Sequence, residues 1–208
     1  MIRYPMLMTC FLLGATDSTT HADPLPFDFK DPKGVNTLTF LLDSPLEPIV
    51  GYANGLSGTV LFDPQKPDAL SGHLILSASS VQTPIPMMSK TLHTADWLNV
   101  EKYPTIELSF KDFKGTKKIS ENEYEAKLQA DLMIMGKTQK VDVTAKATYL
   151  PGKLGDRVPN TKGDLLVVRA NFGLSRKEFG IQAGQHLEKV ADQIQVQAYI
   201  VGIRPESE

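Results

Sequence analysis

Cysteine is almost absent from this chain: its 208 residues contain a single one, Cys10. One thiol cannot form an intramolecular disulfide, and it cannot supply the cysteine cluster of a structural zinc site. The fold must therefore be held by its apolar core. A chain of this length buries well over half of the surface that its unfolded form exposes, so it needs no covalent cross-link.

An excess of charge of one sign is also lacking. The chain carries 22 Lys and Arg against 24 Asp and Glu, which gives a formal net charge of −2. A nucleic-acid-binding domain usually presents a basic patch that neutralises phosphates, and we expect no nucleic-acid partner here. The hydrophobic share of 41% is typical of one soluble globular domain.

The spacings that mark common enzymes and metal sites are missing. His73, His93 and His186 stand in three separate regions, with no His-x-His pair and no helical i, i+4 pair. The sequence contains no Gly-x-Ser-x-Gly elbow, phosphate-cradling loop or dinucleotide fingerprint. We therefore expect a protein that is not an enzyme and uses no metal or cofactor. A weak hydrolase whose residues come together from distant segments is the minor alternative.

Long hydrophobic runs are absent as well. The apolar stretch at residues 6–15 has about half of the ~20 residues that a membrane-spanning helix needs, so we expect no transmembrane anchor. Arg3 precedes this stretch, and Thr20 and Ala22 supply the small residues expected at the −3 and −1 positions of a cleavage site, as in a secretory signal peptide. We predict a signal over 1–22 and an exported domain over 23–208. The expected location is the periplasm, with secretion as the alternative.

Beyond that segment, alternation of apolar and polar residues dominates the chain, which is typical of strands with one buried face. The alternation is clearest in "TIELSF", "YEAKLQADLMIM", "KVDVTAKATYL" and "QIQVQAYIVG". Four further segments fit the same reading: 36–42, 57–63, 72–81 and 165–174. Most of these segments are separated by Gly- or Asn-bearing turns that suit antiparallel hairpins.

Helix is scarce in the pattern. The stretch from Pro86 to Val100 predicts one or two short helices, the second beginning at Thr94. Met87 and Met88 within it are expected to fill gaps in the core, with adaptation to variable ligand shapes as the alternative. The Pro- and Gly-rich residues 150–164 predict a long hairpin loop rather than a domain boundary.

About eight antiparallel strands in one domain allow a two-sheet sandwich or a closed barrel. Strands of similar length in sequential hairpins favour an all-β, antiparallel, up-and-down barrel of about eight strands. Its inward faces carry many short side chains, namely Ala78, Ala126, Ala130, Ala145, Ala147 and Ala198. These alanines fit either the taper of a solid core or a bore kept open for an elongated apolar molecule, and periodicity leaves both readings open.

Four segments together resemble one known family. They are "SGHLILSASSVQTPIP", "LHTADWLNVEKYPTIELSF", "ADLMIMGKTQKVDV" and "LSRKEFGI", and they follow one another in the order found in the YceI-like family of exported, lipocalin-like proteins. The resemblance covers roughly residues 56 to 202. It implies a barrel that sequesters or transports a polyisoprenoid, an isoprenoid quinone or another long-chain lipid in the cell envelope. It also implies that the segment around Trp97 packs against one end of the barrel.

Two positions depart from the family pattern. The first strand region reads "TFLLDS" and Met135 occupies the "TIHG" turn, where members commonly carry histidines. Arg176 does match the arginine of the family's Arg-x-x-Phe-Gly motif, with Glu178 in place of Asp. A guanidinium pairs well with a phosphate or carbonyl group, so Arg176 is our candidate for orienting a head group. The alternative is a local Arg176–Glu178 ion pair beside a buried Phe179.

The predicted ligand-binding residues combine the inward faces of the strands with this arginine. They are Leu76, Ala78, Leu108, Phe110, Leu128, Ala130, Leu132, Val143, Ala145, Phe172, Arg176, Val196 and Ala198.

A different class of function would use the outer surface. The segment "DSPLEPIVGYANG" contains Leu46, Ile49, Val50 and Tyr52 and is unusually apolar for a loop. It either caps one end of the barrel or docks a partner in the cell envelope. A homodimer is compatible with the sequence but is not indicated by any motif.

Overall fold

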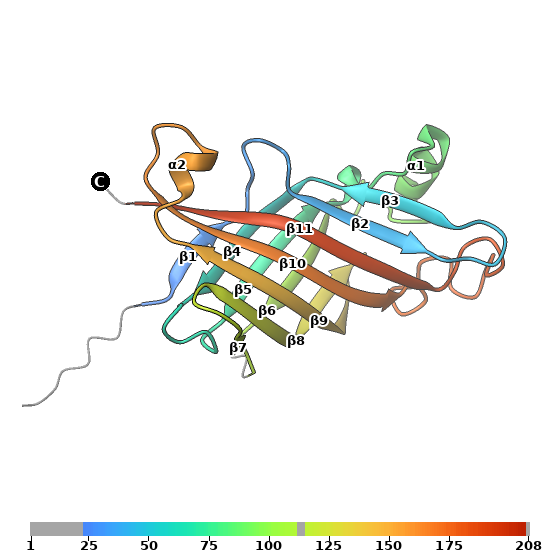
Figure 1. Cartoon of the computed structure of the whole chain (residues 1–208). Coiled ribbons are helices and arrows are strands. Elements are labelled where there is room, and N and C mark those ends of the chain that lie inside the picture. Colours follow the sequence, from blue (N-terminus) through green and yellow to red (C-terminus); the bar gives the residue numbers. More distant parts are fainter. Residues whose placement is uncertain (1–22, 112–114, 207–208) are drawn as a thin grey trace, which may run out of the picture.

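The computed structural model describes residues 23–111 and 115–206, most of which belong to one strongly curved antiparallel sheet (Figure 1). The predicted signal peptide, 1–22, lies outside the described residues. Within the described ranges, no helix is both long and apolar enough to cross a membrane.

Eight strands close this sheet into a barrel. Around the ring the order is β1, β4, β5, β6, β8, β9, β10, β11 and back to β1. The ring strands are β1 Leu25–Asp28, β4 Leu56–Phe62, β5 Ser71–Ser77, β6 Thr105–Phe110, β8 Glu123–Ile134, β9 Lys137–Leu150, β10 Gly163–Ser175 and β11 Gln193–Pro205. Outside the ring, β2 Thr37–Leu42 and β3 Ile49–Ala53 form a hairpin on β11, while β7 Lys117–Lys118 pairs with β8. The predicted all-β antiparallel barrel is confirmed.

The membership of the ring differs from the prediction in one strand. All eight predicted segments contain an observed strand, but β2 lies beside the ring and β1 takes the eighth place. β1 has only four residues, one of them Pro26, so it is too short to show a clear period of two and carries a residue that strands usually avoid. β3 and β7 were not predicted either. A strand was predicted as far as residue 81, but β5 ends at Ser77 and a 3₁₀ turn, η1 Ala78–Ser80, follows.

The helices are short. α1 spans Pro86–His93 and begins with a proline, which suits the first helical position because its missing N–H has no partner there. The Thr94 hydroxyl donates to the carbonyl of Thr91 (2.7 Å), so Thr94 ends α1 and does not begin a second helix. α2 Leu154–Arg157 lies in the predicted hairpin loop and was missed. Met87 is 70% exposed, so its predicted place in the core was wrong.

Aromatic side chains fill the end of the barrel beside β1. Phe62 packs edge-on against Tyr124 (ring centroids 5.0 Å apart), and Phe27 packs edge-on against Tyr149 (6.1 Å). The Tyr149 hydroxyl donates to Asp164 (3.1 Å). Burial, together with this hydrogen bond, raises the pKa of Tyr149 to about 12. This end of the barrel is therefore a packed aromatic plug.

The ring closes where the first described strand, β1, meets the last, β11. β1 and β11 pair through one residue couple, Asp28 with Ile203. The Asn36 side chain strengthens this seam because its amide donates to the carbonyls of Phe29 and Val201 (3.0 Å each) and its carbonyl accepts from the Val201 N–H (2.8 Å). Asn36 is 2% exposed, so these bonds form away from water. The seam therefore depends on contacts between residues that are far apart in the sequence.

Candidate binding cavity

The barrel encloses a cavity of about 260 Å³. Seven of the eight ring strands, all except β1, contribute side chains to its wall, together with β2 and β3. The wall is almost wholly apolar, since the lining residues that can form hydrogen bonds are only Thr39, Trp97, Thr116, Tyr124 and Arg176. The structure therefore favours the open bore over the solid core, the two readings that the alanine pattern left undecided.

Strand register brings short side chains together at one level of the cavity wall. Ala126 pairs with Ala145, Ala145 with Ala170, and Ala170 with Ala198, so four alanines lie side by side on β8, β9, β10 and β11. All four line the cavity. At ~4.8 Å between strands, this alanine belt covers about 14 Å of the wall. Short side chains at one level of the wall leave space that larger residues would fill.

The cavity runs along most of the barrel. On β8 alone its lining extends from Tyr124 to Ile134. Ten steps along a strand, at ~3.3 Å each, correspond to ~33 Å, and a strand tilt of ~35–45° reduces this to about 25 Å along the barrel axis. The bore is therefore long, as an extended chain molecule would require.

The two ends of the bore are built differently. At the end beside β1, Phe62 and Tyr124 line the cavity, whereas Phe27 and Tyr149 do not and belong to the aromatic plug. The other end is covered by the segment that carries α1, which contributes Val81, Leu92, Trp97 and Leu98, and by Ile181 from the loop after β10. The Trp97 segment thus packs against one end of the barrel, as the family resemblance implied.

Eleven of the thirteen predicted site residues line this cavity: Leu76, Leu108, Phe110, Leu128, Leu132, Val143, Ala145, Phe172, Arg176, Val196 and Ala198. The other two, Ala78 and Ala130, are each 1% exposed and are not part of the lining. Ala78 lies in the turn η1, where the chain has already left β5. Ala130 follows the period-two pattern of β8, but its single carbon lies between the longer Leu128 and Leu132. That the lining residues contact a ligand stays a prediction.

Sequence reasoning missed part of the wall. Leu38 and Phe40 of β2 line the cavity, as does Ala170 of β10. Both strands were predicted, and alternation alone would have placed these residues inward. The missing information was the register, which sets Ala170 opposite Ala145 and Ala198.

Arg176 is the most deeply buried charged residue described, at 1% exposure. Its Nε donates to the carbonyl of Ala191 (3.0 Å), and Nη1 and Nη2 donate to those of Ile181, Gln182, Gln185 and Val190. A guanidinium has five N–H groups, so every donor is used on backbone carbonyls. Arg176 thus organises the loop over residues 176–192.

This geometry corrects both sequence-based readings of Arg176. It has no donor left for a ligand head group, and its partners are carbonyl oxygens rather than Glu178. The charged group that stabilises the Arg176 cation is Asp192, whose carboxylate accepts from the Ser175 hydroxyl (2.6 Å) and the Lys177 N–H (3.0 Å). Phe179 is buried, as expected.

Acid should weaken this loop. Burial alone would raise the pKa of Asp192, but the hydrogen bonds from Ser175 and Lys177 and the charges of Lys177 and Arg176 lower it below its ordinary value. A lowered pKa in the folded state means that the carboxylate stabilises the fold above the unfolded-state pKa of ~3.9. We expect this stabilisation to be complete at pH 6 and to be lost as the pH falls below about 4.

Urea unfolding between pH 3 and pH 7 measures this effect. Asp192→Asn should flatten the dependence of the unfolding free energy on pH in the acid range. Asp131→Asn, which removes an exposed carboxylate paired with Lys140 on the outer face, is the matched control and should leave the dependence unchanged. An equal flattening in both variants would contradict the assignment to Asp192.

The histidines do not gather at the cavity. His73 lies 3.0 Å from Glu107 on the outer face, and His93 Nε2 lies 2.8 Å from the carbonyl oxygen of Val81. Met135 and Gly136 both adopt positive φ in the turn between β8 and β9, and neither lines the cavity. Across residues 23–111 and 115–206, no three His, Cys, Asp or Glu side chains lie together in a way that could hold a metal ion.

Known proteins resemble this chain in both sequence and fold. A family model described as the YceI-like domain matches residues 36–201. The crystal structure of Burkholderia cenocepacia BcnA is similar with a TM-score of 0.61 and 20% identity, covering 80% of this chain and 95% of that one. A polyisoprenoid binding domain from Saccharophagus degradans gives a TM-score of 0.63 at 13% identity, covering 88% and 99%. No curated protein matches the chain.

Proposed function

Because this chain belongs to the YceI-like family, we propose that it binds the apolar chain of a polyisoprenoid, an isoprenoid quinone or a similar long-chain lipid inside its barrel and does not act as a catalyst. One observation carries the proposal: an almost wholly apolar cavity lined along most of the barrel's length. The likeness to the polyisoprenoid binding domain of Saccharophagus degradans supports the same ligand class.

The length of the bore favours a long chain. The hydrocarbon core of a bilayer is ~30 Å thick, so an acyl chain in one leaflet spans about 15 Å. The lined bore extends about 25 Å along the barrel axis by strand geometry. It therefore suits a chain longer than an ordinary acyl tail, such as a prenyl chain of many units.

Burial of apolar surface is sufficient to supply the affinity. Covering ~500 Å² of ligand surface contributes about 12 kcal/mol gross, at ~25 cal/mol per Å². Lost translational freedom and chain ordering offset a large part of this gain, which leaves an expected Kd in the micromolar to nanomolar range. A polar head group gains nothing inside this wall, so it lies outside the bore. Binding of this kind serves sequestration or transport of the lipid, which we place in the periplasm after export.

The proposal is tested by native mass spectrometry of protein purified without detergent from its own envelope, followed by extraction and identification of any bound lipid. Titration with geranylgeraniol provides a second measurement. Trp97 is the sole tryptophan and lines the bore, so its fluorescence should change as the chain enters. A stoichiometric prenyl or acyl lipid and a saturable Trp97 signal are expected. A lipid-free mass together with no response to prenyl alcohols would reject the proposal.

A further inference from the structure

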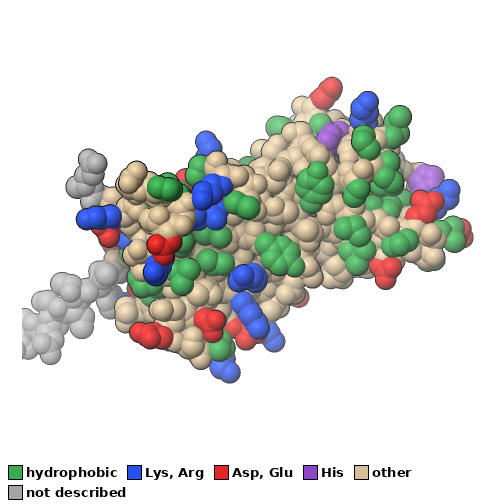
Figure 2. All heavy atoms as spheres, turned by 45° about the horizontal axis from the view of Figure 1, so that its top comes forward, with side chains coloured by type: hydrophobic (Ala, Val, Ile, Leu, Met, Phe, Trp, Pro, Cys, Tyr) green, Lys and Arg blue, Asp and Glu red, His purple; other side chains and the backbone are tan. Residues whose placement is uncertain are grey.

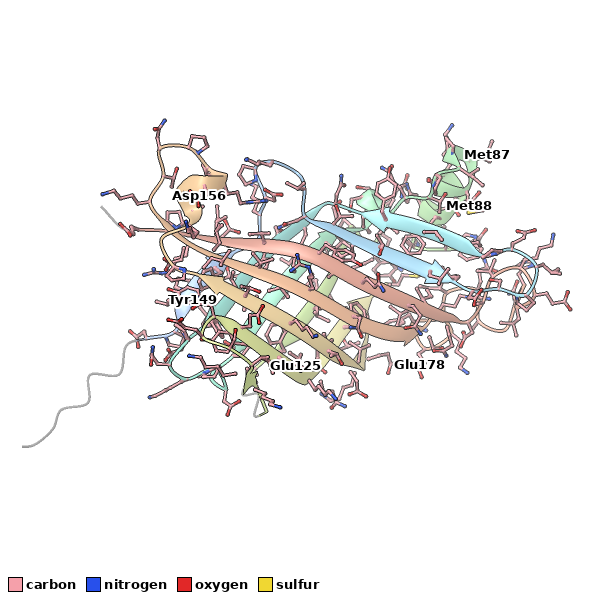
Figure 3. All side chains as sticks on the ribbon, in the orientation of Figure 1. Met87, Met88, Glu125, Tyr149, Asp156 and Glu178 are labelled. Atoms are coloured by element: carbon pink, nitrogen blue, oxygen red, sulfur yellow. The ribbon has the colours of Figure 1, made fainter. Side chains whose placement is uncertain are left out.

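Exposed apolar side chains gather at one end of the barrel. Of the eleven large hydrophobic residues exposed in the described ranges, seven lie within residues 41–52, within residues 85–87 or in the loop after β10. Figure 2 shows green side chains clustered toward this end of the molecule. Figure 3 places Met87 and Met88 on α1, at the end opposite Tyr149. We define the α1-end patch as Leu46, Val50, Tyr52, Ile85, Met87 and Leu187, which are 40% to 70% exposed.

Backbone contacts show that the members of the patch are neighbours. Val50 and Tyr52 lie on β3, two residues apart and therefore on one face of the strand. Tyr52 forms an isolated bridge with Gln82, which brings β3 beside the chain leading to Ile85 and α1. The N–H of Leu46 donates to the carbonyl of Glu188 (3.0 Å), next to Leu187. Three chain segments thus contribute to one surface.

The same segments also close the bore. Leu92 and Trp97 turn inward and line the cavity, whereas Ile85 and Met87 on the same segment turn outward. No residue of α1 itself is buried. The segments that cover this end of the cavity on their inner side therefore carry the α1-end patch on their outer side. A lipid that entered or left at this end would pass the patch.

The patch is too small for a stable dimer and fits a membrane better. A standard interface buries about 800 Å² on each partner and uses about 20–30 residues a side, whereas the patch has six exposed side chains that project from strand β3, helix α1 and the loops beside them. Its flanking charges are mixed, with Glu47 and Glu188 against Lys90 and Lys189, which gives no reason to expect an acidic or basic protein partner. Exposed Leu, Ile and Met beside a Tyr are suited to shallow insertion among lipid head groups.

We propose that the α1-end patch docks the protein reversibly on the surface of a lipid bilayer, so that the covered end of the bore faces the membrane. The inference rests on the proposed function in one respect, since a lipid in the bore explains why the α1-end patch lies beside the covered end of the bore. Docking itself is a separate property of the surface. Because the insertion is apolar, it should not require anionic lipid.

Flotation with extruded phosphatidylcholine vesicles tests the docking. The double variant Ile85→Glu, Met87→Glu should reduce the vesicle-bound fraction at least tenfold. The matched control is Val35→Glu, Ile119→Glu, which changes two similarly exposed residues (58% and 51%) away from the patch, and it should float like the unaltered protein. Both double variants should have the same Tm as the unaltered protein, because all four of the replaced residues are exposed.

The outcomes separate this inference from the proposed function. Loss of flotation with an unchanged Trp97 response to geranylgeraniol in vesicle-free solution supports docking by the patch. Flotation of a protein that has a lipid-free mass and gives no Trp97 response would retain the docking and reject the lipid site. Absence of flotation of the unaltered protein would overturn the docking whatever the bore binds. The docking would also be overturned if the unaltered protein were a dimer and the patch variant a monomer, because the patch would then bind a second copy of the chain.

Discussion

Replacing Arg176 with methionine is expected to destabilise the protein by about 4 kcal/mol or more, because it removes the buried cation on which five backbone carbonyls depend. Methionine fills much of the same volume but donates no hydrogen bond, so the carbonyls of the 176–192 loop would be left without partners away from water. Thermal and urea unfolding measure the loss. The matched control is Arg169→Met on β10, the strand that ends just before Arg176, where the side chain is exposed, and its effect should stay within about 0.5 kcal/mol.

Arg176→Lys separates a structural role from a ligand-binding one. Lysine keeps the charge but has three donors on a flexible stem instead of a planar fork, so we expect a large loss of stability here too. At a temperature where this variant is folded, affinity for prenyl alcohol and for prenyl phosphate should change together and by less than about threefold. A selective loss of prenyl phosphate binding with unchanged stability would show that Arg176 does serve the head group.

Narrowing the alanine belt is expected to abolish lipid binding while leaving the fold intact. In Ala170→Phe, a phenyl ring enters the cavity beside Ala145 and Ala198. We expect affinity for geranylgeraniol to fall at least 100-fold, which corresponds to about 2.7 kcal/mol. The Tm should change little, since the ring fills existing space and buries apolar surface. Phenylalanine is chosen because it preserves Trp97 as the only tryptophan.

The control places the same ring on the other side of the wall. Asn171 is the next residue of β10 and is exposed, so Asn171→Phe adds equal bulk to the outer face and should bind lipid normally. The double variant Ala145→Phe, Ala170→Phe should give no detectable Trp97 response. If Ala170→Phe bound lipid as well as the unaltered protein, the bore would not be the binding site.

Alternation was sufficient to predict the long strands, because each has one buried and one solvated face. β8 shows this clearly, with Tyr124, Ala126 and Leu128 buried and Lys127 exposed. The same signal could not identify β1, because four residues give too few repeats, and its place in the ring depends on pairing with β11 at the far end of the sequence. Local patterns carry no information about such distant pairs.

Most of the residues that line the cavity could be predicted from the sequence, but the role of an individual residue such as Arg176 could not. Facing direction follows from the period of two, which is why most of the predicted lining residues do line the bore. The role of Arg176 depends on where five carbonyls of a loop lie, and a loop without periodicity does not reveal its path. Ala78 was misplaced for a related reason, since nothing in "SASSV" marks the point where β5 gives way to a 3₁₀ turn.

The seam between β1 and β11 also bears on the order in which the molecule assembles. Hairpins such as β8–β9 join neighbouring residues and can form early, whereas the bonds between Asn36 and Val201 join residues 165 positions apart. Contacts of such long range are slow to form, because the chain must first lose the entropy of closing a large loop. We therefore expect the interior of the barrel to close late in folding, after the hairpins have formed, so that a ligand can be enclosed only once this seam is complete.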